Sequence, residues 1–139
     1  MTIMDVARTD VVSAGPDTSV KELAEQMGRE NVGSVIIEKN GKIEGIVTDR
    51  DLALRCLQNS ESAEGMTAKD VMSKEVETID ANTGVFEAIE TMSQKGVRRM
   101  PITDGRRIAG IVTMDDLTIL LASEVSDLSK IAEKEAPAY

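Results

Sequence analysis

The sequence contains no histidine and no tryptophan, and its 139 residues include one phenylalanine, one tyrosine and one cysteine. Without histidine, the chain lacks the commonest general base and the commonest zinc ligand. A single cysteine cannot form an intrachain disulfide, and we expect Cys56 to be a small apolar helix residue rather than a nucleophile. The scarcity of aromatic side chains also removes the platforms on which single-stranded nucleic acids stack.

The sequence also lacks an excess of positive charge and any long hydrophobic run. Its net charge is −9, whereas a protein that binds duplex nucleic acid needs a basic face to displace counterions. No apolar segment approaches membrane-spanning length, and the N-terminus has no signal-peptide pattern. We therefore expect a cytoplasmic protein with neither nucleic acid nor membrane as a partner. Hydrophobic residues make up 41% of the chain, and because aromatic residues are almost absent, its core must consist of Val, Ile, Leu, Met and Ala.

What the sequence does contain is a repeat. The segment GIVTDRDL at residues 45–52 returns as GIVTMDDL at residues 110–117, an offset of 65 residues. The same offset, without a gap, relates Asp5 to Asp70, Val6 to Val71, Val11 to Val76, Thr18 to Thr83, Val20 to Val85, Glu22 to Glu87, Glu25 to Glu90, Met27 to Met92, Val32 to Val97 and Ile43 to Ile108. Two similar units tend to dock with pseudo-twofold symmetry, and the cleft between them is the natural place for a ligand.

Each repeat predicts the order strand, helix, strand, strand, helix. In the first repeat we expect a strand at residues 11–13, followed by a helix that Asp17 or Thr18 caps and whose apolar stripe is Val20, Leu23, Ala24 and Met27. Two strands should follow at residues 34–38 and 43–47. A second helix should then begin at Thr48 and continue through Leu52, Leu54 and Leu57. The dipeptide Asn40-Gly41 predicts the hairpin turn between the two later strands.

The second repeat follows the same plan. We expect Asn82 or Thr83 to cap a helix with the stripe Val85, Ala88, Ile89 and Met92, and strands at residues 100–103 and 108–112 to form a hairpin that turns at Asp104-Gly105. Because this turn signal is displaced by one residue from that of the first copy, the two hairpin loops should differ in shape while their strands correspond.

These patterns divide the chain into four parts. We place the first repeat at residues 4–58, a linker at 59–67 within which residues 59–65 are polar and small, the second repeat at 68–122, and a helical tail at 123–139. The tail keeps an apolar spacing at Val125, Leu128 and Ile131 and should fray near Glu133. Such a stripe needs a partner, either the body of its own chain or another subunit, and the sequence leaves both open.

The repeated pattern Gly-x-x-Thr-x-x-Asp has two interpretations. Thr48 with Asp51, and Thr113 with Asp116, resemble capping boxes at helix N-termini, and the preceding glycine can simply admit a neighbouring backbone. The pattern recurs, however, at two strand-to-helix junctions, where free N–H groups and the helix dipole suit a phosphate. There the threonine hydroxyl could bind a phosphate oxygen, and the aspartate carboxylate could accept hydrogen bonds from both hydroxyls of a ribose. The two side chains together would bind a nucleotide.

Arg98 and Arg99 stand next to each other just before an apolar strand. Successive strand residues point to opposite faces, so that one can face a cleft, where guanidinium suits phosphate; the alternative is two surface charges on an edge strand. The first copy carries Gly33 and Ser34 there, so the two clefts cannot be equal. A further group of acids, Asp49, Asp115 and Glu44, has neither a histidine nor a calcium-loop spacing and is expected to be solvated.

With these motifs, the chain resembles a tandem pair of cystathionine-β-synthase (CBS) domains, a Bateman module, over roughly residues 4–122. The resemblance implies a mixed α/β (α+β) fold in which two β-α-β-β-α repeats pack through their sheets with pseudo-twofold symmetry, and it implies a homodimer. The ligand-binding positions that it implies are the carboxylates Asp51 and Asp116, the hydroxyls Thr48 and Thr113, the phosphate-binding Arg98 and Arg99, and the base-lining Ser13, Ala14, Thr78 and Ile79. The first copy departs from the family pattern at Gly33-Ser34-Val35-Ile36, where a basic residue and a proline would stand.

The leading functional hypothesis is a stand-alone regulatory module. It would bind an adenine nucleotide (AMP, ADP or ATP) or S-adenosylmethionine between its repeats and signal to an unidentified protein by a change of shape. Magnesium could enter with a polyphosphate, although the sequence does not require it, and no catalytic cofactor is implied. An enzyme is disfavoured because no activated nucleophile is present. A structural or adaptor protein that uses the fold for protein–protein contact remains the alternative.

Overall fold

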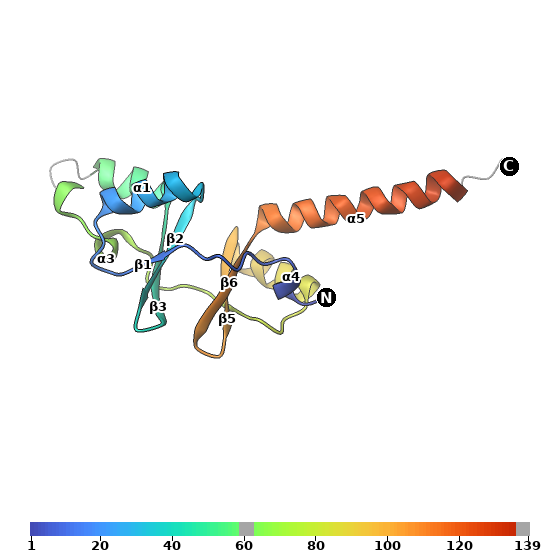
Figure 1. Ribbon diagram of the computed structural model, residues 1–139, viewed down its shortest axis with the longest axis horizontal. Helices are drawn as coiled ribbons and strands as arrows, with labels where there is room; N and C mark the ends of the chain where they lie inside the picture. Colours follow the sequence, from blue (N-terminus) through green and yellow to red (C-terminus); the bar gives the residue numbers. More distant parts are fainter. Residues whose placement is uncertain (59–62, 136–139) are drawn as a thin grey trace.

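The computed structural model describes residues 1–58 and 63–135, which form a mixed α/β fold with two three-stranded sheets. The first sheet contains β1 (Ser13–Ala14), β2 (Ser34–Lys39) and β3 (Lys42–Thr48), and the second contains β4 (Ile79–Asp80), β5 (Arg99–Asp104) and β6 (Arg107–Thr113). In each sheet a short parallel strand flanks an antiparallel hairpin. The two hairpins lie side by side in the centre of the molecule (Figure 1).

The two hairpins share one register, and their turns differ. Each register shifts at an equivalent position, between Ile37 and Glu38 in the first and between Ile102 and Thr103 in the second. In the first turn both Asn40 and Gly41 have positive φ, as a two-residue type I′ turn requires, whereas in the second only Gly105 does. The prediction of matching strands with unlike loops is therefore confirmed, but the predicted turn at Asp104-Gly105 is wrong: Asp104 still pairs with Arg107 in the hairpin, and the turn residues are Gly105 and Arg106, the counterparts of Asn40 and Gly41.

The first long helix of each repeat forms where its apolar stripe predicts, but the predicted caps are wrong. Helix α1 (Val20–Glu30) begins after Ser19, whose hydroxyl accepts a hydrogen bond from the Glu22 N–H, and not after Asp17 or Thr18. Helix α4 (Val85–Lys95) begins after Gly84 without a side-chain cap, and not after Asn82 or Thr83. In both cases the predicted residue lies in the preceding turn, where the Thr18 N–H donates to the carbonyl of Gly15 and the Thr83 N–H to that of Asp80.

The helices that end the repeats are unlike each other. In the first repeat, α2 (Asp49–Asp51) continues directly into the π-helical turn η2 (Leu52–Cys56), and Leu54 and Leu57 are exposed rather than part of a buried stripe. In the second repeat, α5 (Met114–Glu135) runs as one helix through Glu133 and projects from the body (Figure 1). No helix among residues 1–58 and 63–135 is long and apolar enough to cross a membrane.

The segment between the repeats lies partly outside the described residues. Positions 59–62 of the predicted linker are among those not described, and residues beyond them form the 3-10 turn η3 (Ala63–Gly65). The short helix α3 (Ala68–Val71) follows. At the other end of the chain, the 3-10 turn η1 (Ile3–Asp5) occupies the equivalent place before the first repeat.

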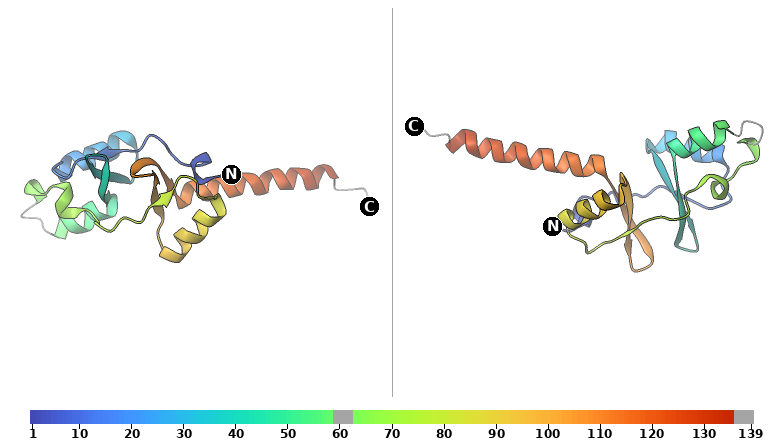
Figure 2. Two further views of the ribbon diagram at one scale, coloured as in Figure 1. Left: turned by 90° about the horizontal axis from the view of Figure 1, so that it is seen from below. Right: turned by 180° about the vertical axis from the view of Figure 1, so that it is seen from behind.

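Each repeat completes its hydrophobic core with the segment that leads into the other repeat. Ile3, from η1, is fully buried among second-repeat residues such as Met100 and Ile102. Ala68 and Val71, from α3, are fully buried in the core of the first repeat. The views in Figure 2 show both leading segments crossing between the halves. Neither half therefore holds a complete core within one continuous stretch of sequence.

The crossing chains explain the glycine of the repeated motif. Arg8 and Ile111 exchange two backbone hydrogen bonds, both 3.0 Å long, and Ser73 and Ile46 exchange an equivalent pair. A Cβ at Gly110 would stand 2.8 Å from the carbonyl oxygen of Arg8, and one at Gly45 would stand 2.8 Å from that of Ser73. The sequence-based interpretation that this glycine admits a neighbouring backbone is confirmed at both sites.

Replacing Gly110 with alanine should destabilise the protein by about 1–3 kcal/mol, the usual cost of forcing a methyl group into a closely packed site. The matched control is Gly28→Ala, because a Cβ at Gly28 in the interior of α1 meets nothing within 4 Å. This control should be neutral or stabilising by up to about 1 kcal/mol, since alanine is the better helix former. Urea denaturation of both variants measures the difference, and equal effects would contradict the proposed clash.

Candidate functional site

Two clefts of similar size lie between the repeats. The larger, of about 390 Å³, is called cleft A; the residues that line it are Arg8, Asp10, Val11, Val12, Glu30, Asn31, Val32, Gly33, Ser34, Ile36, Arg98, Arg99, Ile111, Thr113, Met114 and Asp115. The other, of about 380 Å³, is called cleft B; it is lined by Ile46, Thr48, Asp49, Arg50, Ser73, Glu75, Val76, Glu77, Val97, Arg98, Arg99 and Pro101. Both clefts draw residues from both repeats.

The clefts are related by the sequence repeat. Every residue that lines cleft B is the counterpart, 65 positions away, of one that lines cleft A. Thr48 thus corresponds to Thr113, and Val76 to Val11. The symmetry is imperfect in chemistry, because Arg8 of cleft A corresponds to Ser73 of cleft B. The two clefts therefore share one backbone frame but present different side chains to a ligand.

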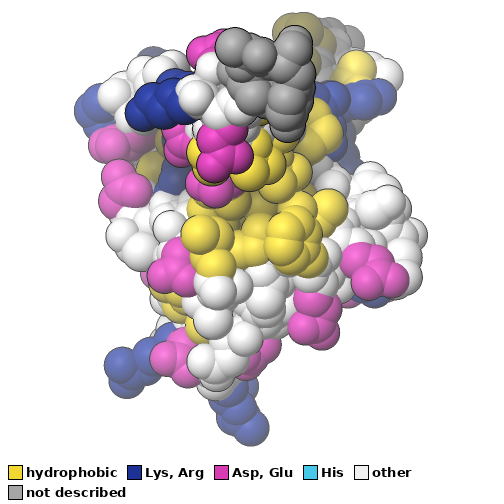
Figure 3. Space-filling model, turned by 90° about the vertical axis from the view of Figure 1, so that its right-hand side faces the viewer, with side chains coloured by type: hydrophobic (Ala, Val, Ile, Leu, Met, Phe, Trp, Pro, Cys, Tyr) yellow, Lys and Arg dark blue, Asp and Glu magenta, His cyan; other side chains and the backbone are white. Residues whose placement is uncertain are grey.

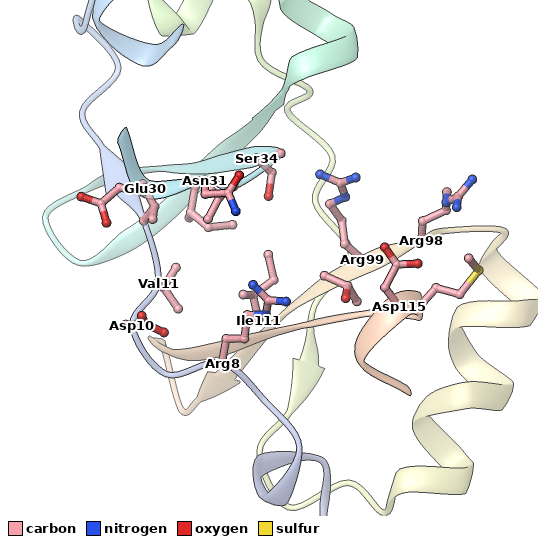
Figure 4. Close-up of a pocket in the computed structure, with 16 residues that line it drawn as sticks. Arg8, Asp10, Val11, Glu30, Asn31, Ser34, Arg98, Arg99, Ile111 and Asp115 are labelled. Atoms are coloured by element: carbon pink, nitrogen blue, oxygen red, sulfur yellow. The ribbon is translucent and has the colours of Figure 1, made fainter. Parts of the chain in front are cut away.

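Cleft A gathers three guanidinium groups, from Arg8, Arg98 and Arg99 (Figure 4). Arg8 comes from the leading segment, and the adjacent pair comes from the start of β5. Figure 4 shows Glu30, Asn31 and Ser34 on the opposite wall, which belongs to the first repeat. Three carboxylates, from Asp10, Glu30 and Asp115, also line the cleft, so that its fixed charges balance before any anion binds.

Arg99 reaches across to the first repeat because Gly33 has no side chain. A Cβ at Gly33 would stand 3.3 Å from Nη1 of Arg99 and 3.5 Å from Oδ2 of Asp49. Gly33 stands where the second repeat carries Arg98, and its lack of a side chain makes room for the guanidinium group of Arg99. Because both Arg98 and Arg99 line cleft B as well as cleft A, this pair lies where the two clefts meet.

The repeated Thr and Asp residues form the capping boxes that their spacing indicates. The Asp51 N–H donates to Oγ1 of Thr48 (3.1 Å), and the Thr48 N–H donates back to Asp51 (2.9 Å). In the second repeat the Asp116 N–H donates to Oγ1 of Thr113 (3.1 Å), whose hydroxyl donates to Asp116 (2.8 Å). Both threonines line a cleft, whereas Asp51 and Asp116 stand one turn further along their helices, outside the lining of either cleft.

The two equivalent aspartates have different partners. Asp116 pairs with Arg8 of the leading segment, with Nη2 to Oδ1 at 3.0 Å and the Nε–H shared between both oxygens. Asp51 lies 3.8 Å from Nε of Arg55 on its own helix. Burial by itself raises the pKa of Asp116, but hydrogen bonds from Arg8 and Thr113 and the charge of Arg8 outweigh it and hold that pKa below its usual range.

The predicted base-lining residues do not reach either cleft. Ser13 and Ala14 are half-buried in β1, where the Ser13 hydroxyl donates to Glu38 (3.2 Å). Thr78 is exposed, and Ile79 is buried in the core of the second repeat. The positions that do line the clefts come just before them in the chain: Val11 and Val12 in cleft A, Val76 and Glu77 in cleft B.

Several residues that line cleft A were not predicted from the sequence. Asp115, expected to be a solvated helix-start acid, is exposed and also lines the cleft. No motif in the sequence around Asp10 or Glu30 indicates that they line a cleft. Nor does a motif mark Arg8, because its place in the cleft arises from the crossing of the leading segment onto β6. When the two repeats are aligned at the 65-residue offset, Arg8 stands opposite the uncharged Ser73, and this difference in charge could have identified Arg8.

Neither a metal site nor a reactive thiol emerges among the residues that the structure describes. No three His, Cys, Asp or Glu side chains in that part of the chain group in a way that could hold a metal ion. Cys56 is half-buried beside the core of the first repeat, and burial raises the pKa of its thiol. A raised pKa lowers the fraction of thiolate, which agrees with the expectation that Cys56 is a structural residue.

Comparison with known proteins identifies both repeats. The CBS domain family matches residues 3–57 and 68–123. An uncharacterised protein of Methanopyrus kandleri is 35% identical over 141 residues, which cover 96% of this chain and 71% of that protein. The CBS domain-containing protein YhcV of Bacillus subtilis is 33% identical over 118 residues, which cover 84% of this chain and 83% of YhcV.

A solved structure shares the arrangement of both halves. It is the CBS domain pair of protein MJ0100 in complex with 5′-methylthioadenosine and S-adenosyl-L-methionine. That structure is 26% identical in sequence, has a TM-score of 0.77, and covers 87% of this chain and 99% of its own. The fold of two CBS repeats that pack through their sheets is thus found in a protein crystallised with adenosyl compounds.

Replacing Arg8 with alanine should raise the pKa of Asp116 toward its ordinary value, because the main hydrogen-bond donor and the nearest positive charge are lost. A carboxyl whose pKa is lower in the folded state than in the unfolded chain stabilises the fold at any pH above its ordinary pKa, about 3.9. This stabilisation is lost as the pH falls toward and through the pKa of the folded state. The variant should therefore lose up to about 1 kcal/mol of unfolding free energy at pH 7, and this difference should vanish at acid pH.

Denaturation at several pH values and an NMR titration of the Asp116 carboxyl measure both effects. Arg29→Ala is the control, because Arg29 pairs with Glu30 at 3.7 Å with both side chains largely exposed. It should change neither the Asp116 titration nor the pH dependence. An Asp116 pKa that is the same with and without Arg8 would contradict the assigned role of this ion pair.

Proposed function

Because the chain belongs to the CBS-domain family, we propose that cleft A binds an adenosyl ligand and that binding regulates a partner protein. The observation that carries the proposal is the composition of cleft A, where both repeats and the leading segment contribute side chains. A ligand there would touch both repeats and the first of the two crossing segments. It can therefore favour one relative arrangement over another, which is what regulation by a ligand requires.

The side chains of cleft A suit the parts of a nucleotide. Val11, Val12, Ile36 and Ile111 offer aliphatic surface for a base. The hydroxyl of Thr113, at the N-terminus of α5, and the guanidinium groups can bind phosphate oxygens. This chemistry favours a phosphate-bearing adenine nucleotide such as AMP, ADP or ATP over S-adenosylmethionine, whose sulfonium is positively charged. The MJ0100 complex supports the adenosyl class in general.

We place the ligand in cleft A rather than cleft B because of the leading segment. Arg8 adds a guanidinium beside Thr113 that Ser73 cannot supply beside Thr48. In the protein alone Arg8 is held by Asp116. A bound nucleotide would compete for this contact, because its phosphates would draw Arg8 into the cleft and away from Asp116, which lies just outside the lining.

This exchange of partners gives the ligand a route to the rest of the molecule. The leading segment that carries Arg8 is anchored at one end by Ile3 in the core of the second repeat, and it continues at the other end into β1 of the first repeat. A shift of Arg8 would therefore displace chain that is attached to both halves. The proposed signal is a small change in the angle between the repeats, read by a partner protein.

A second candidate function is an adaptor that contacts proteins without sensing a ligand. The observation that favours it is that both motif carboxylates, Asp51 and Asp116, already accept hydrogen bonds within their capping boxes. If those bonds are their whole purpose, the clefts need no ligand. Titration with AMP, ADP, ATP, NAD and S-adenosylmethionine separates the candidates, because an adaptor should bind none of them at millimolar concentration.

Replacing Arg99 with alanine should weaken the binding of ATP or AMP by roughly 10- to 100-fold, since a hydrogen bond to a charged group contributes about 1.5–3 kcal/mol. Adenosine, which has no phosphate, should bind almost as before. Isothermal titration calorimetry measures both. Arg106→Ala is the control, because Arg106 lies in the turn between β5 and β6, outside the lining of both clefts. Equal losses for ATP and adenosine would rule out a phosphate contact.

A matched pair of variants assigns the cleft. Thr113→Val and Thr48→Val each remove the capping hydroxyl of an equivalent helix and should cost similar stability, about 1 kcal/mol. Only Thr113 lines cleft A, so only Thr113→Val should weaken the nucleotide. Weakening by Thr48→Val alone would move the ligand to cleft B.

A further inference from the structure

Asn31 ends helix α1 in a backbone conformation that residues other than glycine seldom adopt. Its φ is 53° and its ψ is 49°, in the left-handed region. The equivalent residue of the second repeat is Gly96, with φ 65° and ψ 33°. Both helix ends close with the same hydrogen bond of 3.1 Å, from the N–H of the next residue to the carbonyl four residues before the cap. The backbone therefore needs no side chain here, and glycine, which has no Cβ, suits it better.

The side chain that Asn31 carries at this strained position belongs to the wall of cleft A. Figure 4 shows Asn31 between Glu30 and Ser34, on the wall opposite Arg8 and Ile111. The residue is exposed, and no hydrogen bond from the rest of the described chain occupies its carboxamide. The donors and the acceptor of this group are thus free to bind a ligand.

A carboxamide distinguishes cleft A from the other hollows of the molecule described so far and from the groove between α4 and α5. Among the described residues, no Asn or Gln lines cleft B. The groove has a volume of about 410 Å³ and a mainly apolar lining that includes Ile89, Met92 and Leu117 but no amide side chain. Figure 3 shows hydrophobic side chains gathered at the centre of the face toward which α5 projects. Apolar surface accepts any flat ring, so selection of one base requires precisely placed polar groups.

The carboxamide of asparagine matches one edge of adenine. It presents an acceptor oxygen and an NH2 donor side by side, and adenine presents its N6 amino group and its N7 acceptor at one edge. Hypoxanthine and guanine carry an oxygen in place of that amino group. They therefore offer two acceptors there, and the carboxamide oxygen would be left without a donor.

We propose that Asn31 is the residue of cleft A that selects adenine. Its carboxamide oxygen accepts a hydrogen bond from the N6 amino group, and its NH2 group donates to N7. This inference rests on the proposed function of cleft A and adds the residue that reads the base. Cleft B cannot read a base in this way, because the counterpart Gly96 has no side chain.

The place of Asn31 along the cleft suits the base rather than the phosphate. In Figure 4, Asn31 lies toward the same end of the cleft as Val11, one of the aliphatic residues offered to a base, whereas Arg98 lies at the other end. Asp10 and Glu30 also lie at the end of Val11, and their negative charge favours an amino group over a carbonyl oxygen. The arginine end would then hold the phosphates of the same nucleotide.

The first experiment measures base selection by isothermal titration calorimetry of the full chain with AMP and IMP, and with ATP and ITP. The members of each pair differ only in the purine. The wild type should bind the adenine member about 5- to 100-fold more tightly, the usual discrimination of a matched pair of hydrogen bonds. Asn31→Gly should reduce this ratio by roughly fivefold or more, because it weakens the adenine member and leaves the hypoxanthine member nearly unchanged.

The matched control is Asn40→Gly. Asn40 has the same left-handed conformation, with φ 54°, but it lies in the turn between β2 and β3, outside the lining of both clefts. This variant should keep the wild-type ratio. Both variants should fold, since Gly96 already holds the position of Asn31 in the second repeat, and thermal unfolding followed by circular dichroism verifies it.

The outcomes separate this inference from the proposed function. If neither AMP nor ATP binds at millimolar concentration, the proposed function fails and the role of Asn31 fails with it. If they bind but IMP and ITP bind equally well, or if the preference for adenine survives in Asn31→Gly, the role of Asn31 is overturned and the proposed function stands. Survival of the preference would assign the selection to other groups, such as Asp10 and Glu30.

A second experiment tests the hydrogen bond to N7 by itself. The probe is 7-deaza-ATP, which has a C–H group in place of N7 and keeps the N6 amino group. The wild type should bind it roughly 2- to 10-fold more weakly than ATP, the contribution of one hydrogen bond. Asn31→Gly should bind both nucleotides alike. An equal loss in the wild type and in Asn31→Gly would overturn the donation from Asn31 to N7.

Discussion

The exchange of leading segments is the interaction on which the rest of this structure depends. Ile3 helps to fill the core of the second repeat, and Ala68 and Val71 help to fill that of the first, so that each half needs the piece of chain that leads into the other. The backbone pairs between Arg8 and Ile111, and between Ser73 and Ile46, fix the segments against the hairpins. This arrangement holds the sheets side by side, and the two clefts lie where the crossing segments meet the strands.

The clefts show how one frame can carry two chemistries. The backbone repeats closely, even to the position of the shift in hairpin register, since strand pairing and glycine contacts tolerate little change. The side chains on that frame are free to differ. Arg8 pairs with Asp116 across the crossing, whereas the basic side chain beside Asp51 is Arg55, four residues further along the same chain segment. Arg98 and Arg99 of one repeat then serve both clefts, because Gly33 of the other leaves them room.

Arg98 lies where the two clefts and the groove beside α5 come together. It lines both clefts and also the groove beside α5, and its carbonyl anchors the first residue of that helix. The groove between α4 and α5 thus adjoins both clefts at this residue.

The sequence by itself determined the duplicated plan, the first hairpin turn, the two capping boxes and the apolar stripe of α5. These depend on neighbours in the chain: a Thr and an Asp three residues apart, an Asn-Gly turn, or a helical period. It misplaced the caps of α1 and α4, because several polar residues compete within one turn. Only the tertiary structure decided that Val11 and Val12 rather than Ser13 and Ala14 line cleft A, and that Arg8 reaches Asp116. That contact spans 108 residues and exists because the chain crosses between the halves, which no local pattern encodes.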